Sequence, residues 1–361
     1  MGKKSIFYFF MPILLSLIHC ISHIQASSKT ITIERKSVYP NKFDDYYFKP
    51  LVDMEIHNNK LYAVENFGHR LIIFDLNGEI QLDKVVSQSG QGPGDLNLPI
   101  SLSVDQDEIA VKDSYGFSFF DVEGNFINKF RAYTQKSNFI FRRNNIYWVN
   151  FSPDDNHLIE IYSKQGERLS TFGNKYLKLN FDLFDSNRLG PYFIEDNVYS
   201  GNLMTDGEYI YFINSFFGRV DIFNYSGERI KNSYITDLFG DLGTKTIGEN
   251  TKLWLTDGFT IKRDGIVYTY MLFLDAYLTG NTIYLLKNYW PPKADSGDDK
   301  VSILAIDKST FILIKEYSFP RDKDDSISTC FAVLERDNIP TFFIFIRTLD
   351  GDIIAEYSEK T

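Results

Sequence analysis

Phe74-Asp75-Leu76-Asn77-Gly78 is the stretch that decides the fold, because close copies of it recur along the chain. Its second residue can accept a hydrogen bond from a turn amide, and its fifth is a glycine that tolerates a positive φ. Such a segment predicts a tight hairpin between two antiparallel strands. The further copies are 120–124, 162–166, 223–227, 306–310 and 347–351. Glycine ends every copy except the fifth, which ends in Thr310.

The copies recur with a period that indicates the architecture. Their last residues are spaced 46, 42, 61, 83 and 41 residues apart. Short runs rich in β-branched and aromatic residues flank the turns, as strands do; they are 60–64, 71–74, 108–111, 117–120, 209–213 and 220–223. A four-stranded propeller blade takes about 40–50 residues. The sequence therefore predicts an all-β, six-bladed β-propeller of four-stranded antiparallel blades. It also predicts one face for the equivalent hairpins that contain Gly78, Gly124, Gly166, Gly227 and Gly351.

Two features modify this simple count. The longer intervals predict insertions near 173–194 and 231–270. Three apolar runs within 252–268 leave a seven-bladed ring as the alternative, but Lys262 stands where a turn Asp or Ser belongs, so six blades are preferred. Residues 30–34 lie outside the repeats and are predicted to complete the last blade and close the ring.

The N-terminus has the features of an export signal. Lys3 and Lys4 precede an apolar stretch, and Ala26 offers a cleavage site. The stretch is shorter than the roughly 20 residues of a spanning helix. We therefore predict a signal peptide over 1–26, a single domain over 27–361, and a periplasmic or secreted product without a transmembrane segment. A lipoprotein anchored through Cys20 is the alternative.

The net charge and the number of cysteines limit the binding partners and the disulfides that can be expected. The net charge is −10, and it becomes −12 when residues 1–26 are removed. Such a surface repels a phosphate backbone, so no nucleic-acid partner is expected. Only two cysteines occur, and after cleavage Cys330 has no partner for an intramolecular disulfide. We expect a monomer.

One segment resembles a known family. Gly90-Gln91-Gly92-Pro93-Gly94-Asp95-Leu96-Asn97-Leu98-Pro99 is similar to the link between blades in NHL-type six-bladed propellers. Glu65-Asn66-Phe67-Gly68-His69-Arg70-Leu71-Ile72 resembles the family's Asn-x-Arg-Ile core, and residues 211–220 are a more divergent copy. The match is good over 51–131 and fair over 192–235. The resemblance, which extends to exported bacterial propellers, implies a fold and a binding habit but no reaction.

The residue types that commonly take part in catalysis or bind metals form no recognisable motif in this sequence. His57, His69 and His157 are predicted to lie in three different blades, each near a turn, so they form no zinc site. The acidic clusters 295–299 and 322–325 lack the spacing of a calcium loop. No Gly-x-Ser-x-Gly elbow is present. No cofactor, no metal site and no catalytic residue is predicted, which favours binding over enzymatic activity.

Loop lengths suggest where binding occurs. The link 87–99, the excursions 173–194 and 231–270, and the segment 290–299 are all predicted to lie on one face of the ring. The predicted function is an exported module that binds a protein, peptide or glycan through this face. A propeller hydrolase or lyase with a polar or metal-assisted site in the central channel is the alternative. The candidate binding residues are Phe67, His69, Arg70, Tyr115, Phe151, Phe216, Phe217, Arg219, Trp254 and Trp290.

Overall fold

The computed structural model describes most of the chain between residues 29 and 360. The described residues are 29–40, 47–132, 139–150, 155–175, 201–215, 218–235, 260–263, 266–269, 273–287, 300–320 and 326–360. They contain strands and turns and no helix. None of the described residues therefore forms a helix that could cross a membrane. The predicted signal peptide and Cys20 lie outside them.

Four sheets have four antiparallel strands each, in chain order from the inside of the ring outward. The first comprises β2 (Leu51–His57), β3 (Lys60–Glu65), β4 (Arg70–Asp75) and β5 (Gln81–Val85). The second comprises β6 (Ser101–Asp105), β7 (Glu108–Lys112), β8 (Gly116–Asp121) and β9 (Phe126–Arg131). The third comprises β10 (Phe139–Arg142), β11 (Asn145–Val149), β12 (His157–Ser163) and β13 (Arg168–Asn174). The fourth comprises β14 (Gly201–Thr205), β15 (Ile210–Asn214), β16 (Arg219–Phe223) and β17 (Arg229–Tyr234).

Eight further strands form one sheet in the order β20-β21-β22-β23-β1-β26-β25-β24. One half comprises β20 (Phe273–Thr279), β21 (Thr282–Lys287), β22 (Lys300–Asp307) and β23 (Leu313–Pro320). The other comprises β24 (Ser326–Arg336), β25 (Ile339–Thr348), β26 (Gly351–Glu359) and the N-terminal β1 (Lys29–Tyr39). Each half is antiparallel within itself.

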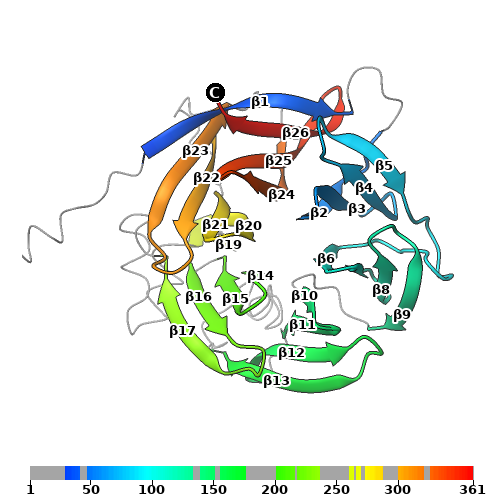
Figure 1. The fold of residues 1–361 in the computed structure, drawn as a ribbon. Coiled ribbons are helices and arrows are strands. Elements are labelled where there is room, and N and C mark those ends of the chain that lie inside the picture. Colours follow the sequence, from blue (N-terminus) through cyan, green and yellow to red (C-terminus); the bar gives the residue numbers. More distant parts are fainter. Residues whose placement is uncertain are drawn as a thin grey trace, which may run out of the picture.

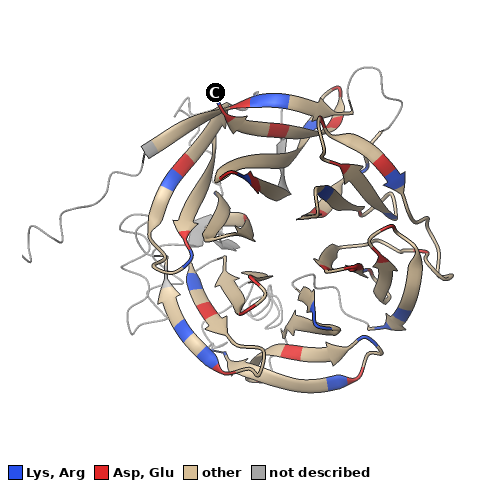
Figure 2. Ribbon diagram, in the orientation of Figure 1, with Lys and Arg blue, Asp and Glu red and all other residues tan. Residues whose placement is uncertain are grey.

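The sheets are arranged radially around a common centre, so the fold is a β-propeller (Figure 1). The innermost strands β2, β6, β10, β14, β20 and β24 contact one another in this cyclic order, and β24 contacts β2. The ring is therefore closed. The middle strands are buried on both sides, because each sheet packs against two neighbours; Leu71 to Phe74 of β4 are at most 1% exposed. The outer strands carry charges of both signs (Figure 2).

Ring closure was correctly predicted for residues 30–34, and the structure adds a second contact. β1 pairs antiparallel with β26, where Ile33 lies opposite Glu359 and Tyr39 opposite Ile354. Before that, the first residues of β1 pair in parallel with β23, with Lys29 opposite Lys315. One strand thus joins the outer edges of both halves of the eight-stranded sheet.

The repeated turns form as the sequence predicts. In each copy the side chain of the second residue accepts a hydrogen bond from the amide two residues later, as Asp75 Oδ1 does from Asn77 at 2.9 Å. Gly124, Gly166 and Gly227 have φ between 81° and 87°, as expected. Gly78 does not adopt a positive φ. The requirement for glycine was therefore wrongly predicted at that turn.

The equivalence of Gly351 was also wrongly predicted. Gly78, Gly124, Gly166 and Gly227 lie between the third and fourth strands of their sheets, whereas Gly351 follows the turn between β25 and β26, the second and third strands. Successive antiparallel turns alternate between the two ends of a sheet, so Gly351 lies on the opposite face. The cause is ring closure, because the outermost strand next to β26 is supplied by the N-terminus.

The long excursion contains strands of its own. β18 (Thr260–Arg263) and β19 (Ile266–Thr269) form a separate two-stranded sheet between β17 and β20. Beyond β17, the described residues of 231–270 that form strands are those of this hairpin. Residues 176–200, 236–259 and 288–299 lie outside the described chain.

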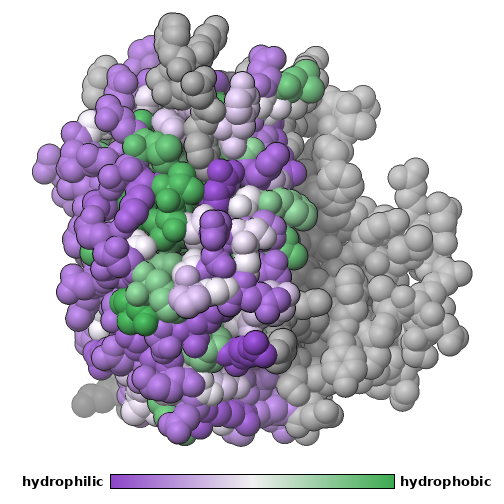
Figure 3. All heavy atoms as spheres, turned by 90° about the vertical axis from the view of Figure 1, so that its right-hand side faces the viewer, coloured by the Kyte–Doolittle hydropathy of each residue, from purple (hydrophilic) through white to green (hydrophobic). Residues whose placement is uncertain are grey.

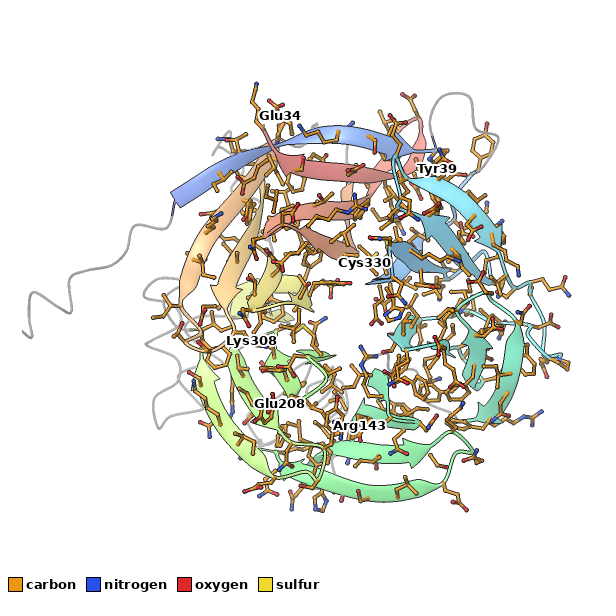
Figure 4. The ribbon with its side chains drawn as sticks, viewed as in Figure 1. Glu34, Tyr39, Arg143, Glu208, Lys308 and Cys330 are labelled. Atoms are coloured by element: carbon orange, nitrogen blue, oxygen red, sulfur yellow. The ribbon has the colours of Figure 1, made fainter. Side chains whose placement is uncertain are left out.

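The two faces of the ring differ in their connections. We call the turn face the one that carries the turns between first and second strands and between third and fourth strands. There, neighbouring sheets are tied together, as when Arg143 Nη2 donates to Gly207 O at 3.2 Å and Lys308 Nζ lies 2.9 Å from Asp206 Oδ2. Figure 4 labels Arg143, Glu208 and Lys308 along these turns. The loop-rich face is the opposite one and includes residues 66–69, 86–100 and 113–115.

Candidate functional site

The inner strands enclose a cavity of about 700 Å³ in the central channel. Its walls mix apolar and polar side chains. The titratable and hydrogen-bonding groups among them include Asp53, Glu55, Ser101, Arg142, Asn202, Asp275 and Tyr277. These residues come from five different inner strands. The channel is thus a polar chamber assembled from residues far apart in sequence.

Two aspartates occupy matching places in this chamber. Asp53 and Asp275 each lie four residues before the last residue of their strands, at a register shift against the second strand. Asp53 Oδ2 accepts hydrogen bonds from Ser101 Oγ at 2.6 Å and from the Leu102 amide at 2.9 Å. Both donors belong to β6, the next inner strand. The Asp53 side chain therefore accepts a hydrogen bond from a backbone amide of the innermost strand of the neighbouring sheet.

Asp275 repeats the arrangement in β20, the innermost strand of the first half of the eight-stranded sheet. Its Oδ2 accepts from the Phe331 amide of β24 at 3.2 Å, and its Oδ1 accepts from Asn202 Nδ2 at 2.6 Å. Asp275 thereby links β14, β20 and β24. Cys330, next to Phe331 in β24, is buried and carries a thiol rather than a disulfide (Figure 4).

A second level of side chains lies two residues further along the same strands. Glu55 Oε2 accepts from the Val104 amide at 2.8 Å, and Glu55 Oε1 lies 3.5 Å from Arg142 Nη2. Tyr277 Oη accepts from the Ile56 amide at 3.0 Å. Every one of these contacts joins two inner strands. The polar groups of the channel therefore hold the sheets in register around the ring.

Confinement changes the acidity of these groups. Burial raises the pKa of Asp53 and of Glu55, and for Glu55 the Arg142 guanidinium partly offsets the rise. The pKa of Asp275 is raised well above its usual value, first by burial and then by the charge of Asp53. Burial also raises the pKa of Tyr277. Asp53, Glu55 and Asp275 line the channel cavity as partly buried residues.

The chamber offers no evident metal site. Across the described chain no three or more His, Cys, Asp or Glu side chains lie close enough to hold a metal ion. The carboxylates of Asp53 and Asp275 each already accept three hydrogen bonds from the protein. Their first role is structural, and a ligand in the chamber would have to share these oxygens.

On the loop-rich face the glycine-rich link is held rigidly. Within it, the amides of Gly92 and Leu96 donate to Asp95 Oδ2 at 3.0 Å and to Gln88 O at 3.0 Å. A Cβ on Gly90 would come within 2.2 Å of Asp95 Oδ2, which explains the glycine. The Leu98 amide donates to His69 Nδ1 at 3.0 Å. The link is therefore fixed both to itself and to the preceding turn.

A groove of about 410 Å³ lies beside this link. It is lined by Gln91, Gly92, Pro93, Tyr115, Phe126, Asn128, Lys129 and Arg131. Gln91 Nε2 donates to Tyr115 Oη at 3.0 Å. Figure 3 shows apolar patches on the wall of the ring that carries β5 and β9, and the exposed apolar residues of these two strands are Val85, Phe126 and Ile127. The groove thus lies between the loop-rich face and this wall.

The predicted binding residues are distributed unevenly over these features. Tyr115 lines the groove, and Phe67 projects from its turn with 67% of its surface exposed. His69 positions the link. Arg70 Nε lies 2.5 Å from Oε2 of the buried Glu65, and Arg219 makes two contacts of 2.9 Å with the buried Asp221. Both arginines therefore stabilise their own sheets. The other predicted residues, Phe151, Phe216, Phe217, Trp254 and Trp290, lie outside the described chain.

The distribution of histidines was wrongly predicted. His57 ends β2 and His69 lies in the turn between β3 and β4, so both belong to the first sheet, and only His157 lies elsewhere. The error has a simple origin, because one repeat unit includes both its inner strand and the turn between its second and third strands.

The channel residues were missed by the sequence analysis. Leu51-Val52-Asp53-Met54-Glu55-Ile56-His57 and Phe273-Leu274-Asp275-Ala276-Tyr277-Leu278-Thr279 have the same burial pattern in β2 and β20. Aligning inner strands instead of turns would have placed Asp53 against Asp275. In isolation, each carboxylate is indistinguishable from a solvated residue on an alternating strand.

Comparison with known proteins supports the fold. A protein considered to be exported from Bacteroides fragilis is 14% identical, with 92% of this chain and 99% of that chain covered at a TM-score of 0.54. A member of the DUF4221 family from Bacteroides vulgatus is 10% identical, with 91% and 97% covered at a TM-score of 0.53. A virginiamycin B lyase from Staphylococcus aureus aligns at only 0.48 and carries no argument about activity. No family model and no curated protein matches the chain.

Proposed function

We propose that the protein is an exported propeller that binds a protein, peptide or glycan partner through its loop-rich face. The observation that carries this proposal is the rigid link at 87–99, which forms a groove of about 410 Å³ with Tyr115. A preorganised loop loses little conformational entropy when a ligand binds. Apart from Tyr115, Phe126 and Pro93 offer apolar faces to that ligand. The similarity to an exported protein agrees with this setting.

The proposal includes the finer architecture. We count six blades of NHL-like type, taking the two halves of the eight-stranded sheet as separate blades that share β1. The domain extends over 27–361 after removal of a signal peptide at 1–26, and the product acts as a monomer. The proposal also assigns Trp254 and Trp290, which lie outside the described chain, to the binding residues.

Arrays of glycans and peptides, probed with the full chain, test the binding proposal. We expect Tyr115→Ala to lose the signals that the unchanged protein gives. Ile339→Ala, which removes an exposed apolar side chain from the turn face, should keep them. Binding that is absent from the unchanged protein, or equal in both variants, would contradict the proposal.

A second candidate function is hydrolysis or elimination in the channel. The favouring observation is the set of Asp53, Glu55 and Asp275 with raised pKa values beside a cavity of about 700 Å³. A carboxyl that stays protonated near neutral pH can act as a general acid. A screen of chromogenic esters and glycosides tests it: activity that Asp275→Asn abolishes and Tyr115→Ala preserves would move the functional site to the channel.

A further inference from the structure

The groove beside the glycine-rich link has an uncompensated positive charge. Lys129 Nζ lies 3.1 Å from Asp113 Oδ2 and donates to Asp95 O at 3.1 Å, so its charge is balanced. Arg131 is exposed, and within the described chain its guanidinium forms no ion pair or hydrogen bond. The whole chain is acidic, with a net charge of −10. Arg131 therefore provides a local positive charge for an anion on a protein whose net charge is negative.

The walls of the groove are held in fixed orientations. Phe126 contacts Phe120 edge-to-face, with ring centroids 6.0 Å apart, and leaves 36% of its surface exposed. Gly94 lies beside this side chain, and an added Cβ would make an ordinary van der Waals contact with Phe126 at 3.4 Å. Tyr115 receives the hydrogen bond from Gln91. Two aromatic rings thus face the groove without needing to reorganise on binding.

These groups match the parts of a sugar acid. The C–H face of a pyranose ring packs on aromatic side chains, and the amides of Gln91 and Asn128 can donate to or accept from hydroxyl groups. A guanidinium binds a carboxylate through two parallel hydrogen bonds. A neutral sugar would leave Arg131 unused, and a peptide added along the edge of β9 would rely on the backbone rather than on these amide side chains.

We propose that this groove binds a uronic acid unit of an acidic polysaccharide. The inference rests on the proposed function, because it names the ligand class for part of the loop-rich face. Tyr115 and Phe126 would pack against the ring, and Arg131 would bind its carboxylate. Binding of the uronic acid unit makes and breaks no covalent bond, so the groove would distinguish acidic from neutral sugars by affinity alone.

Isothermal titration calorimetry with a short oligogalacturonate tests the assignment, and the methyl ester of the same oligomer is the neutral counterpart. We expect the acid to bind and the ester to bind about tenfold more weakly or worse, since a hydrogen bond to a charged group contributes about 1.5–3 kcal/mol. Arg131→Gln should weaken binding of the acid by a similar factor and leave the ester unaffected. Arg347→Gln, which changes another exposed arginine, is the matched control.

The outcomes separate this inference from the proposed function. If the acid does not bind the unchanged protein, or binds Arg131→Gln equally well, the uronate assignment is wrong. If Tyr115→Ala meanwhile loses signals on the arrays, the loop-rich face still binds a partner. A peptide whose array signal depends on Arg131 would replace the uronate as ligand. Retained affinity of the acid for Tyr115→Ala would exclude the groove itself.

Discussion

Asp53 and Asp275 occupy equivalent places in two inner strands, and each binds the backbone amide of the inner strand that follows it around the ring. The two distances are 2.9 Å to the Leu102 amide and 3.2 Å to the Phe331 amide. Inner strands have one edge without a strand partner, and a carboxylate satisfies that edge. The arrangement places two like charges around one channel, and the charge of Asp53 raises the pKa of Asp275.

This relationship predicts how stability varies with pH. The folded pKa of Asp275 lies above 3.8, so its folded carboxyl binds more protons than the unfolded one, and its contribution to stability falls as pH rises through the raised value. The free energy of unfolding of the unchanged protein, relative to that of Asp275→Asn, should therefore decrease as pH rises from 3.8 to the raised pKa of the folded carboxyl. Urea titrations at several pH values measure it.

Asp307 supplies a control of opposite sign. Its side chain accepts hydrogen bonds from Ser309 and Thr310, which lower its pKa to about 2. The stability it contributes is present above 3.8 and is lost as pH falls towards 2. Relative to Asp307→Asn, the unchanged protein should gain stability with rising pH over that range. A slope of the same sign for both variants would contradict the account of the channel.

The arginine pairs allow a comparison of buried and exposed charges. Arg70→Met leaves the buried carboxylate of Glu65 without its 2.5 Å contact, and we expect a loss of about 3 kcal/mol in the free energy of unfolding. Arg168→Met removes contacts to Asp155 and Glu160 from a side chain that is 47% exposed, so a loss below about 1 kcal/mol is expected. Chemical denaturation measures both. Adding Glu65→Gln to Arg70→Met should restore part of the loss, and equal losses in the single variants would refute this reasoning.

Two of the repeated glycines should respond differently to alanine. Gly124 has a φ of +81°, and an added Cβ would lie 2.5 Å from Val86 Cγ2. Gly78 has no atom within 4 Å of that position and no positive φ. We expect Gly124→Ala to destabilise the fold by more than about 1 kcal/mol and Gly78→Ala to be neutral or to stabilise it by about 0.4–1 kcal/mol. Thermal denaturation of the pair is the measurement, and similar melting temperatures would count against it.

Removal of β1 should affect both halves of the eight-stranded sheet. A chain that starts at residue 40 exposes the outer edges of β23 and β26 at once, and exposed edges promote association. Size-exclusion chromatography should show oligomers or aggregates, and the unfolding transition should broaden. A chain that starts at residue 29 keeps β1 and is the control. A monomeric, cooperatively folding protein without β1 would show that the pairing of β1 with β23 and β26 is dispensable.

The repeat and the strands around each turn could be predicted from the sequence, because both depend on interactions between residues that are close in the chain. Asp75, Ser163 and Thr348 hold their turns through contacts two residues away. The sixth turn was misplaced for a non-local reason. Thr348 to Gly351 has the same local chemistry as the other copies, but its place in the sheet depends on where β1 pairs, more than 300 residues earlier in the chain.

The candidate site was less accessible to prediction. Tyr115 and the link at 87–99 were identified because an aromatic residue and a glycine-rich loop are visible locally. Arg131 and Phe126 were missed, since they occupy an outer strand whose register relative to the link is set only in the folded protein. For Arg70 and Arg219, which were also included, the structure adds an ion pair with a buried carboxylate of the same sheet.

The shared strand also determines how the ring responds to mechanical load. β1 and β26 are antiparallel, and their pairing begins with Ile33 and Glu359, next to the two ends of the described chain. A force that separates the ends therefore opens the facing residue pairs of β1 and β26 one after another, as in a zipper. It does not shear all of these residue pairs at the same time. Tension would open the ring at its closure while β2 to β5 still form an intact sheet.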